Sequence, residues 1–189
     1  DPNIIFVGEI RDSETAGIAV NASLTGHLVL STLHTNDAAT ALPRLLDMNI
    51  EPFLVASTIN VIIAQRLVRK ICEMCKGSST VTREELLQNL PADIIEKYIG
   101  SKKSATVYQG IGCKICHFTS YSGRIGVFEV LGITEAIRDL VARRSNADII
   151  LQKAREEGMT TMLDDGFEKV LKGITTIEEI LRVTKVQLN

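Results

Sequence analysis

The amino-acid sequence predicts an α/β fold, with parallel strands joined by helices near the start of the chain and helices alone near its end. Three observations lead to this prediction. Short runs rich in Ile, Val and Leu at residues 4–7 and 28–33 have the length and composition of buried strands. Apolar residues recur at helical spacing in the segments between and after these runs. Two Cys-x-x-Cys pairs then separate this part from the helical end of the chain.

The composition is that of an ordinary globular protein, and it argues against several classes of function. The 189 residues are 45% hydrophobic and 23% charged, which is sufficient for a sizeable core and gives no sign of disorder. Aromatic residues make up 4%, tryptophan is absent and the net charge is −2, so we expect no nucleic-acid partner. No apolar run approaches the ~20 residues that span a bilayer.

The first part of the chain, residues 1–70, reads as strand, helix, strand, helix, helix, which indicates a parallel sheet. Its first strand is expected to be buried on both faces. Asp12 is placed to cap the first helix, and Pro52 to open a long one. The expected elements are strands at 4–7 and 28–33, and helices at 13–24, from Asn36 or Asp37 to about Met48, and from Pro52 to about Lys70.

The rest of the chain divides into residues 71–131 and residues 132–189. In the first of these, Thr82-x-x-Glu85 is a capping box that opens a helix, and Gly123–Leu131 alternates as a strand does. From Thr134 onward we expect helices only. Two of them begin near Thr161 and Thr176, and the preceding helices end near Gly158 and Gly173.

The four cysteines form two pairs, Cys72-x-x-Cys75 and Cys113-x-x-Cys116, which is the usual layout of an all-cysteine zinc site. Residues 76–112 separate the pairs by more than the ~15–20 residues of a compact ribbon, so the insert needs a helix of its own. Four thiolates would close the coordination of a structural zinc. The alternatives are two disulfides, which would need an oxidising compartment, or four unrelated buried thiols. A redox pair would leave the second pair without a role. The histidine after Cys116 is expected to be a bystander.

Glu9 and His34 each follow an expected strand at its carboxyl end. Ligands of open parallel sheets bind outside those ends, so both side chains can face one site if the strands are neighbours. A glutamate there can deprotonate a water, and a histidine can stabilise a transferring phosphoryl group. His27 precedes the second strand and would lie about 20 Å from His34 at ~3.3 Å per residue, which favours a structural or interfacial role. The alternative for Glu9 is an ordinary charged turn.

The stretch VGEIRDSETAGIAVNASLTGHLVLSTLHTNDA, followed by AQRLVRKIC, closely resembles the ATPases of bacterial type II secretion and type IV pilus extension, the GspE/PulE/PilB family. The resemblance continues through both cysteine pairs, GRIGVFEVL and GITTIEEILRVT, and so covers essentially the whole chain. It implies that residues 1–70 are the C-terminal half of a RecA-like P-loop NTPase core. Residues 71–131 would be a tetracysteine zinc subdomain, and residues 132–189 a helical C-terminal subdomain.

The resemblance also implies roles for single residues. The first stretch is similar to the family's Walker B segment, in which Glu9 matches the glutamate that prepares the hydrolytic water. Gly8 stands where many P-loop enzymes have an aspartate. Arg11 matches the arginine that fixes the strand tip or contacts a neighbouring subunit. TGHLVLSTLHT resembles the His box, which implicates His34 near the γ-phosphate and keeps His27 as a nucleotide-binding or interface candidate.

The sequence contains no Gly-x4-Gly-Lys-Ser/Thr, the loop that holds nucleotide phosphates with backbone N–H groups and a lysine. The resemblance places that loop upstream, so we expect the isolated chain to be an inactive C-terminal fragment. The full protein would be a cytoplasmic homohexamer, peripheral to the inner membrane, that uses ATP and magnesium and works with an inner-membrane platform protein.

The resemblance also bears on the kind of motor. Retraction motors of the same superfamily resemble residues 1–70 but typically lack the tetracysteine element, which implies an assembly or export motor here, and the long insert favours pilus assembly. A non-catalytic, zinc-stabilised interaction module is the alternative function. Arg124 and Glu129, both in GRIGVFEVL, receive no role from the sequence.

Overall fold

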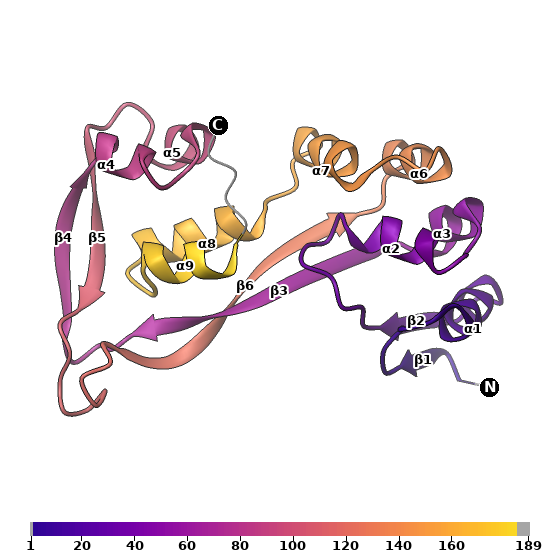
Figure 1. The fold of residues 1–189 in the computed structure, drawn as a ribbon, viewed down its shortest axis with the longest axis horizontal. Coiled ribbons are helices and arrows are strands. Elements are labelled where there is room, and N and C mark those ends of the chain that lie inside the picture. The colour runs from indigo at the N-terminus through magenta and orange to yellow at the C-terminus, as the bar shows by residue number, and fades with distance from the viewer. Residues whose placement is uncertain (1, 185–189) are drawn as a thin grey trace. The chain divides into compact units, whose positions relative to one another are not determined.

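The computed structural model describes residues 2–184, which fold into two units that each have a hydrophobic core (Figure 1). Unit 1 comprises Asp1–Ala64 and Glu129–Thr160, and unit 2 comprises Gln65–Phe128 and Thr161–Asn189. Asp1 and residues 185–189, which the expected three-part division includes, lie outside the described residues. That division, at residues 70 and 131, stays a prediction about roles, which the two units do not test.

Unit 1 begins with the strand–helix–strand order that the sequence predicts. Its two strands pair in parallel, in a register that places Ile4 opposite Leu28. The carboxylate of Asp12 caps the first helix by accepting from the backbone N–H of Thr15, at 2.8 Å. The elements of unit 1 are β1 (Ile4–Val7), α1 (Ser13–Leu24), β2 (Leu28–Ser31), α2 (Ala41–Asp47), α3 (Pro52–Thr58), α6 (Glu135–Ala142) and α7 (Ala147–Glu156).

The expectation that the first strand is buried on both faces is wrong. Val7 and Val29 pack against the core of unit 1, but Ile4 is 58% exposed and Phe6 is 71% exposed. β1 and β2 form a two-stranded sheet, and its apolar outer face has no covering layer among the described residues.

The long helix predicted from Pro52 to Lys70 is also wrong, because α3 ends at Thr58 and a strand, β3 (Val61–Ile71), follows. Alternate residues of β3 are exposed, which is the period of a strand and not of a helix. β3 pairs with β6 (Tyr121–Gly132). The pair is antiparallel, since backbone hydrogen bonds join Asn60 to Ile133 near one end and Cys72 to Ser120 near the other.

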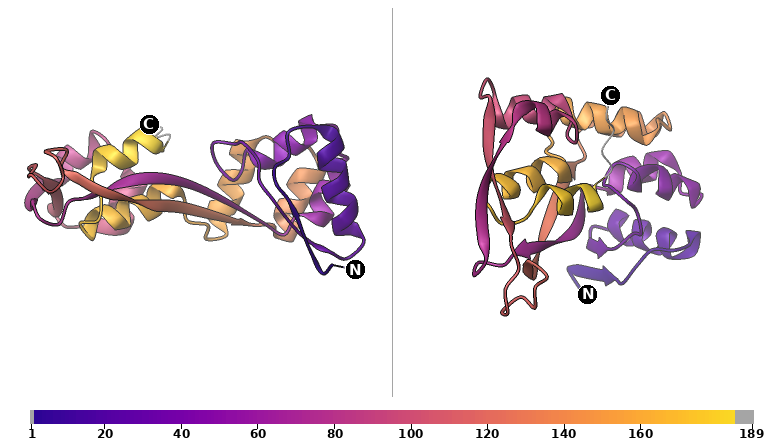
Figure 2. Two further views of the ribbon diagram at one scale, coloured as in Figure 1. Left: turned by 90° about the horizontal axis from the view of Figure 1, so that it is seen from below. Right: turned by 60° about the vertical axis from the view of Figure 1, so that its left-hand side comes forward.

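Unit 2 contains the insert between the cysteine pairs. Thr82 and Glu85 form the predicted capping box, but the helix that they open is short and lies within a hairpin that the sequence did not predict. Figure 2 (right) shows the two hairpin strands side by side. The elements that lie wholly in unit 2 are β4 (Lys76–Thr82), α4 (Arg83–Leu87), α5 (Ala92–Ile99), β5 (Ser104–Gly110), α8 (Met162–Leu171) and α9 (Ile177–Val183).

The last four helices follow β6 and are divided between the units, with α6 and α7 in unit 1 and α8 and α9 in unit 2. Thr161 and Thr176 cap α8 and α9 as predicted. A separate all-helical C-terminal region is therefore not shown. Within residues 2–184, no helix combines the length and the apolar character needed to cross a lipid bilayer.

A buried carboxylate holds α9 to β3 inside unit 2. The side chain of Glu179 accepts hydrogen bonds from the backbone N–H of Arg69 at 2.8 Å and from its guanidinium at 2.7 Å. The guanidinium of Arg182 donates to the same carboxylate at 2.8 and 3.0 Å. Burial alone would raise the pKa of Glu179, but the two arginines outweigh it and hold the pKa at about 2.

This low pKa predicts a pH dependence of stability. Because the pKa of Glu179 is lower in the folded chain than in the unfolded one, its stabilisation is complete above about pH 4.5 and disappears as the pH falls towards 2. The loss should reach about 3 kcal/mol. Urea unfolding of the wild type and of Glu179→Gln at several pH values measures it. The difference between their free energies of unfolding should be largest near neutral pH and should almost vanish at about pH 2. A difference that does not change with pH would contradict the assignment of the low pKa to Glu179.

Candidate functional site

The structure brings Glu9 and His34 together, as their positions after neighbouring parallel strands predict. The Nε2 atom of His34 lies 2.9 Å from Oε2 of Glu9. Two further hydrogen bonds join the strand ends beside them. The backbone N–H of Ile10 donates to the carbonyl of Thr32 at 2.9 Å, and the Thr32 hydroxyl donates to the carbonyl of Gly8 at 2.8 Å. The two side chains are therefore carried by backbones that are fixed to each other.

The electrostatics of the pair keep the carboxylate charged. The hydrogen bond from His34, together with that from Arg11 at 2.7 Å, lowers the pKa of Glu9 below its ordinary value. Glu9 is therefore an anion at neutral pH and able to accept a proton. The site is open, since the side chain of His34 is 80% exposed and that of Arg11 is 70% exposed.

Gly8 and His27 take different positions. Gly8 contributes its carbonyl to the bond with Thr32, and a Cβ added to it would meet no atom within 4 Å. The Nδ1 atom of His27 lies 2.9 Å from the Thr25 hydroxyl and 3.0 Å from the Ala22 carbonyl, at the amino end of β2. His34 follows the opposite end of that strand, so the structure does not bring the two histidines together.

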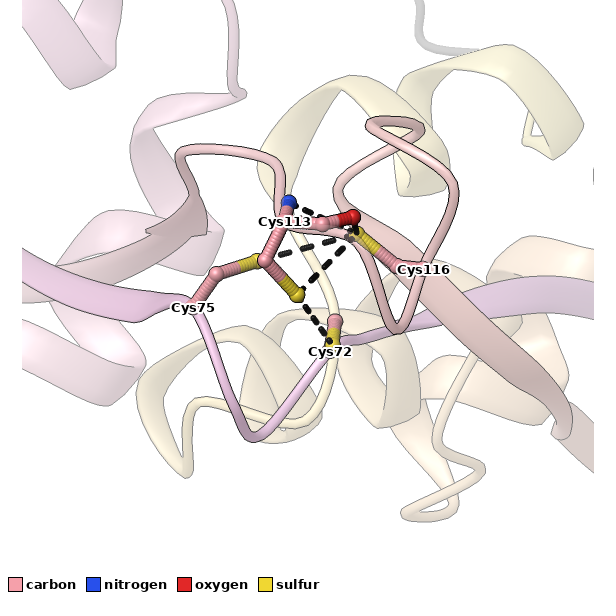
Figure 3. Close-up of side chains that lie close together, drawn as sticks. All are labelled: Cys72, Cys75, Cys113 and Cys116. Atoms are coloured by element: carbon pink, nitrogen blue, oxygen red, sulfur yellow. Dashed lines mark hydrogen bonds between the residues drawn. The ribbon is translucent and has the colours of Figure 1, made fainter.

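The four cysteines converge from two parts of the chain (Figure 3). Cys72 and Cys75 flank the turn between β3 and β4, and Cys113 and Cys116 lie in the loop between β5 and β6. The sulfurs of Cys72 and Cys113 are 3.9 Å apart, as are those of Cys75 and Cys116, and all four lie within 4.8 Å of one another. His117 is outside this group.

These distances fit a tetrahedral metal site and not disulfides. A Zn–S bond of about 2.3 Å implies sulfurs about 3.8 Å apart in a tetrahedron, whereas a disulfide requires about 2.05 Å.

The pKa values of two of the thiols are shifted in opposite directions. Burial raises the pKa of Cys75 to about 11. Burial also acts to raise that of Cys116, but backbone N–H donors of Cys113 and Ser120 outweigh it and lower the pKa to about 6.

The cysteine cluster fastens strand ends within unit 2. The backbone N–H of Ile111 donates to the carbonyl of Cys75, and that of Cys72 to the carbonyl of Ser120, both at 3.0 Å. Gly112, with φ +86, gives the loop the left-handed backbone that other residues rarely adopt. A metal held by these thiols would therefore fix the base of the β4–β5 hairpin to the ends of β3 and β6.

Sequence reasoning missed Glu129, although its position carried a signal. In β6, Val127, Glu129 and Leu131 are buried while the residues between them are exposed. A charged residue at an inward position of an alternating strand is unusual, because burial of an unpaired charge is costly. The carboxylate of Glu129 accepts from the backbone N–H of Ala38 at 2.6 Å.

Fold and site together define an α/β protein with a glutamate–histidine pair at the carboxyl ends of parallel strands and a cluster of four thiols that could hold a metal. Residues 1–182 match the family of type II/IV secretion system proteins, and the chain belongs to that family. The resemblance inferred from the sequence is thereby confirmed.

Relatives named as pilus and as secretion proteins are similar to the chain to the same degree. The type IV pilus assembly ATPase PilB of Pseudomonas aeruginosa is 46% identical over 98% of this chain and 31% of its own length. The type II secretion system protein E of Pectobacterium carotovorum subsp. carotovorum is 45% identical over 98% of this chain and 35% of its own length. The chain thus spans about a third of these relatives.

Two solved structures have a similar fold. The pilus retraction motor PilT, solved with bound ADP, superposes with a TM-score of 0.63 at 25% identity, over 97% of this chain and 40% of that one. The ATPase DotB of Legionella pneumophila superposes with a TM-score of 0.61 at 22% identity, over 96% of this chain and 38% of that one, and shows the fold alone.

Proposed function

We propose that this chain is the C-terminal part of a hexameric ATPase that hydrolyses ATP, with magnesium, to power type IV pilus assembly or type II protein secretion. The observation that carries the proposal is the contact between Glu9 and His34 at the ends of two parallel strands. Phosphate-bearing ligands bind at that edge in open α/β sheets. Relatives named as ATPases support the same activity.

In the proposed reaction, Glu9 orients the attacking water and accepts its proton. Its carboxylate has about four lone-pair positions, so the bonds to His34 and Arg11 leave acceptor capacity for a water. His34 would turn its Nε2–H, which donates to Glu9 in this structure, towards the phosphoryl oxygens as charge develops on them. The exposure of His34 is consistent with this role, since its ring can approach a ligand from the solvent side.

The remaining residues of this proposal bind the nucleotide or a neighbouring subunit. Gly8 leaves room at the strand tip, and the exposed Arg11 is available to the next subunit of a homohexamer. His27 is assigned to an interface, since it lies at the far end of β2. The phosphate-binding loop would come from the part of the relatives that this chain does not match. The whole motor would act in the cytoplasm, against an inner-membrane platform protein.

We further propose that Cys72, Cys75, Cys113 and Cys116 hold a structural zinc. Four thiolates leave no coordination position for water, so the metal would stabilise the fold and take no part in hydrolysis. A chain with this metal but without the phosphate-binding loop would behave as a zinc-stabilised interaction module. That is the second candidate function for the 189-residue polypeptide by itself.

The two candidates are separated by assays of ATP hydrolysis on the 189-residue chain and on a full-length protein that contains it. We expect no phosphate release above blank from the 189-residue chain, because it has no loop to hold the phosphates. The full-length protein should turn over ATP. Turnover by the short chain that disappears in Glu9→Gln would show that the upstream part is dispensable. No turnover by either would leave the interaction module as the function.

A further inference from the structure

Glu129 is a buried carboxylate that the proposed reaction does not use. It lies on β6, is 4% exposed, and belongs to unit 1 together with Glu9 and His34. Its Oε1 atom accepts from the backbone N–H of Ala38, at 2.6 Å, between segments 91 residues apart in sequence. This distance is short for a hydrogen bond from a backbone N–H, which usually measures about 2.9–3.0 Å. This contact therefore holds one point of the backbone firmly.

That point lies four residues beyond His34, in the irregular segment of residues 34–40 between β2 and α2. On the other side of His34, the backbone is held at Thr32 by the bonds to Ile10 and Gly8. His34 is therefore an exposed residue in a short connection with a fixed point at each end.

The segment beyond His34 also has hydrogen bonds of its own. The carboxylate of Asp37 accepts from the backbone N–H of Thr40 at 2.8 Å, and the hydroxyls of Thr35 and Thr40 donate to the Asp37 carbonyl. These bonds give the segment its shape but join it to no other element. Glu129 supplies a bond from the segment to β6, and Ala38 is fully buried beneath it.

We propose that Glu129 is a positioning residue, which sets the place of His34 relative to Glu9 by fixing the backbone at Ala38. The inference rests on the proposed ATPase function, because it assigns Glu129 a role through the histidine of that site. A buried carboxylate contributes little net stability, because the cost of its desolvation offsets much of what its hydrogen bonds contribute. A displacement of about 1 Å at a reacting group, by contrast, costs about a hundredfold in rate.

The test compares Glu129→Met and Glu129→Gln in the full-length protein, by kcat and KM for ATP and by hydrogen exchange of residues 35–40. Methionine keeps the size of the side chain but cannot replace the acceptor, whereas the amide oxygen of glutamine can still accept from Ala38. We expect Glu129→Met to lower kcat about tenfold or more with KM changed less than about twofold. Exchange of residues 35–40 should become faster. Glu129→Gln should keep most of the wild-type kcat and most of the wild-type protection of residues 35–40 from exchange.

Glu179→Met is the matched control, because Glu179 is also buried and also accepts from a backbone N–H, that of Arg69. Assayed below its melting temperature, it should keep the wild-type kcat. A second test places Glu129→Met in a His34→Ala background, where the further loss should be below about twofold if Glu129 acts through His34. Should Glu129→Met fail to fold, Glu129→Asp, which withdraws the carboxylate by one methylene, should lower kcat instead.

Several results would overturn the inference. They are an unchanged kcat in Glu129→Met or Glu129→Asp, a full loss in Glu129→Gln, or an equal loss with and without His34. A wild-type protein with no ATPase activity would instead refute the proposed function. The exchange of residues 35–40 would still report whether Glu129 holds that segment, so the two failures are distinguishable.

Discussion

Glu9→Gln in the full-length protein is expected to lower kcat for ATP hydrolysis by about 10²–10⁴-fold, the range over which general base catalysis contributes. Glutamine has nearly the same shape and still accepts a hydrogen bond from Arg11 or His34, so the strand tip should keep its structure. The substitution removes the negative charge, which Glu9 carries at neutral pH because its pKa is lowered. Without that charge, the side chain can no longer accept the proton of the attacking water.

Phosphate release and nucleotide binding, measured on the same preparation, decide this prediction. Binding of ATP should change by no more than a few fold, because Glu9 acts on the water and not on the phosphates. Glu14→Gln is a suitable control, since Glu14 is an exposed carboxylate in the first turn of the same helix that Asp12 caps. Equal activity of wild type and Glu9→Gln would remove Glu9 from the reaction and return it to the role of a charged turn.

Loss of the metal centre is the second large effect that we expect. Cys72→Ser or Cys113→Ser should lower the melting temperature by about 10 °C, since the free energy of binding a structural metal is free energy of folding. The effect should be large because the cluster fastens the ends of β3 and β6 to the hairpin of β4 and β5. Removal of the metal from the wild type with a chelator should give a similar shift.

Elemental analysis of protein purified without chelator provides the direct measurement, and about one zinc per chain is expected. His117→Ala is the matched control, because His117 is exposed, follows Cys116 directly and is no part of the cysteine group. It should change neither the zinc content nor the melting temperature. An unchanged melting temperature after complete removal of the metal would exclude a structural role for it.

The strands and helices of the first part of the chain were predictable where one pattern prevailed. Asp12 and the apolar runs around it led to β1, α1 and β2, and the parallel pairing followed from their order. The structure of the segment after Pro52 was not predictable, because short apolar runs fit the spacing of a helix as well as the alternation of a strand. In β3, pairing with a strand about 60 residues away decides between the two, and that partner is not visible locally.

The candidate site was predictable to a similar extent. Glu9 and His34 follow strands that the sequence shows, so their meeting could be inferred from topology. The cysteine cluster was predicted from spacing alone, and the structure brings the four sulfurs together. Glu129 could not be assigned, because its partner is a backbone N–H 91 residues earlier, and a backbone donor leaves no mark on the sequence.

The division of the chain into interleaved segments has a consequence for protein engineering. Unit 1 ends its first segment at Ala64 and resumes at Glu129, while unit 2 resumes at Thr161 after the helices of unit 1. Shortening the gene from one end therefore cannot separate the units, because removal of residues 1–64 leaves the second segment of unit 1, and removal of everything after residue 160 takes away the second segment of unit 2. To make unit 2 by itself, the polypeptide would have to be rewired so that Phe128 leads directly into Thr161, which keeps Phe167, Val170 and Ile180 with the core that they complete.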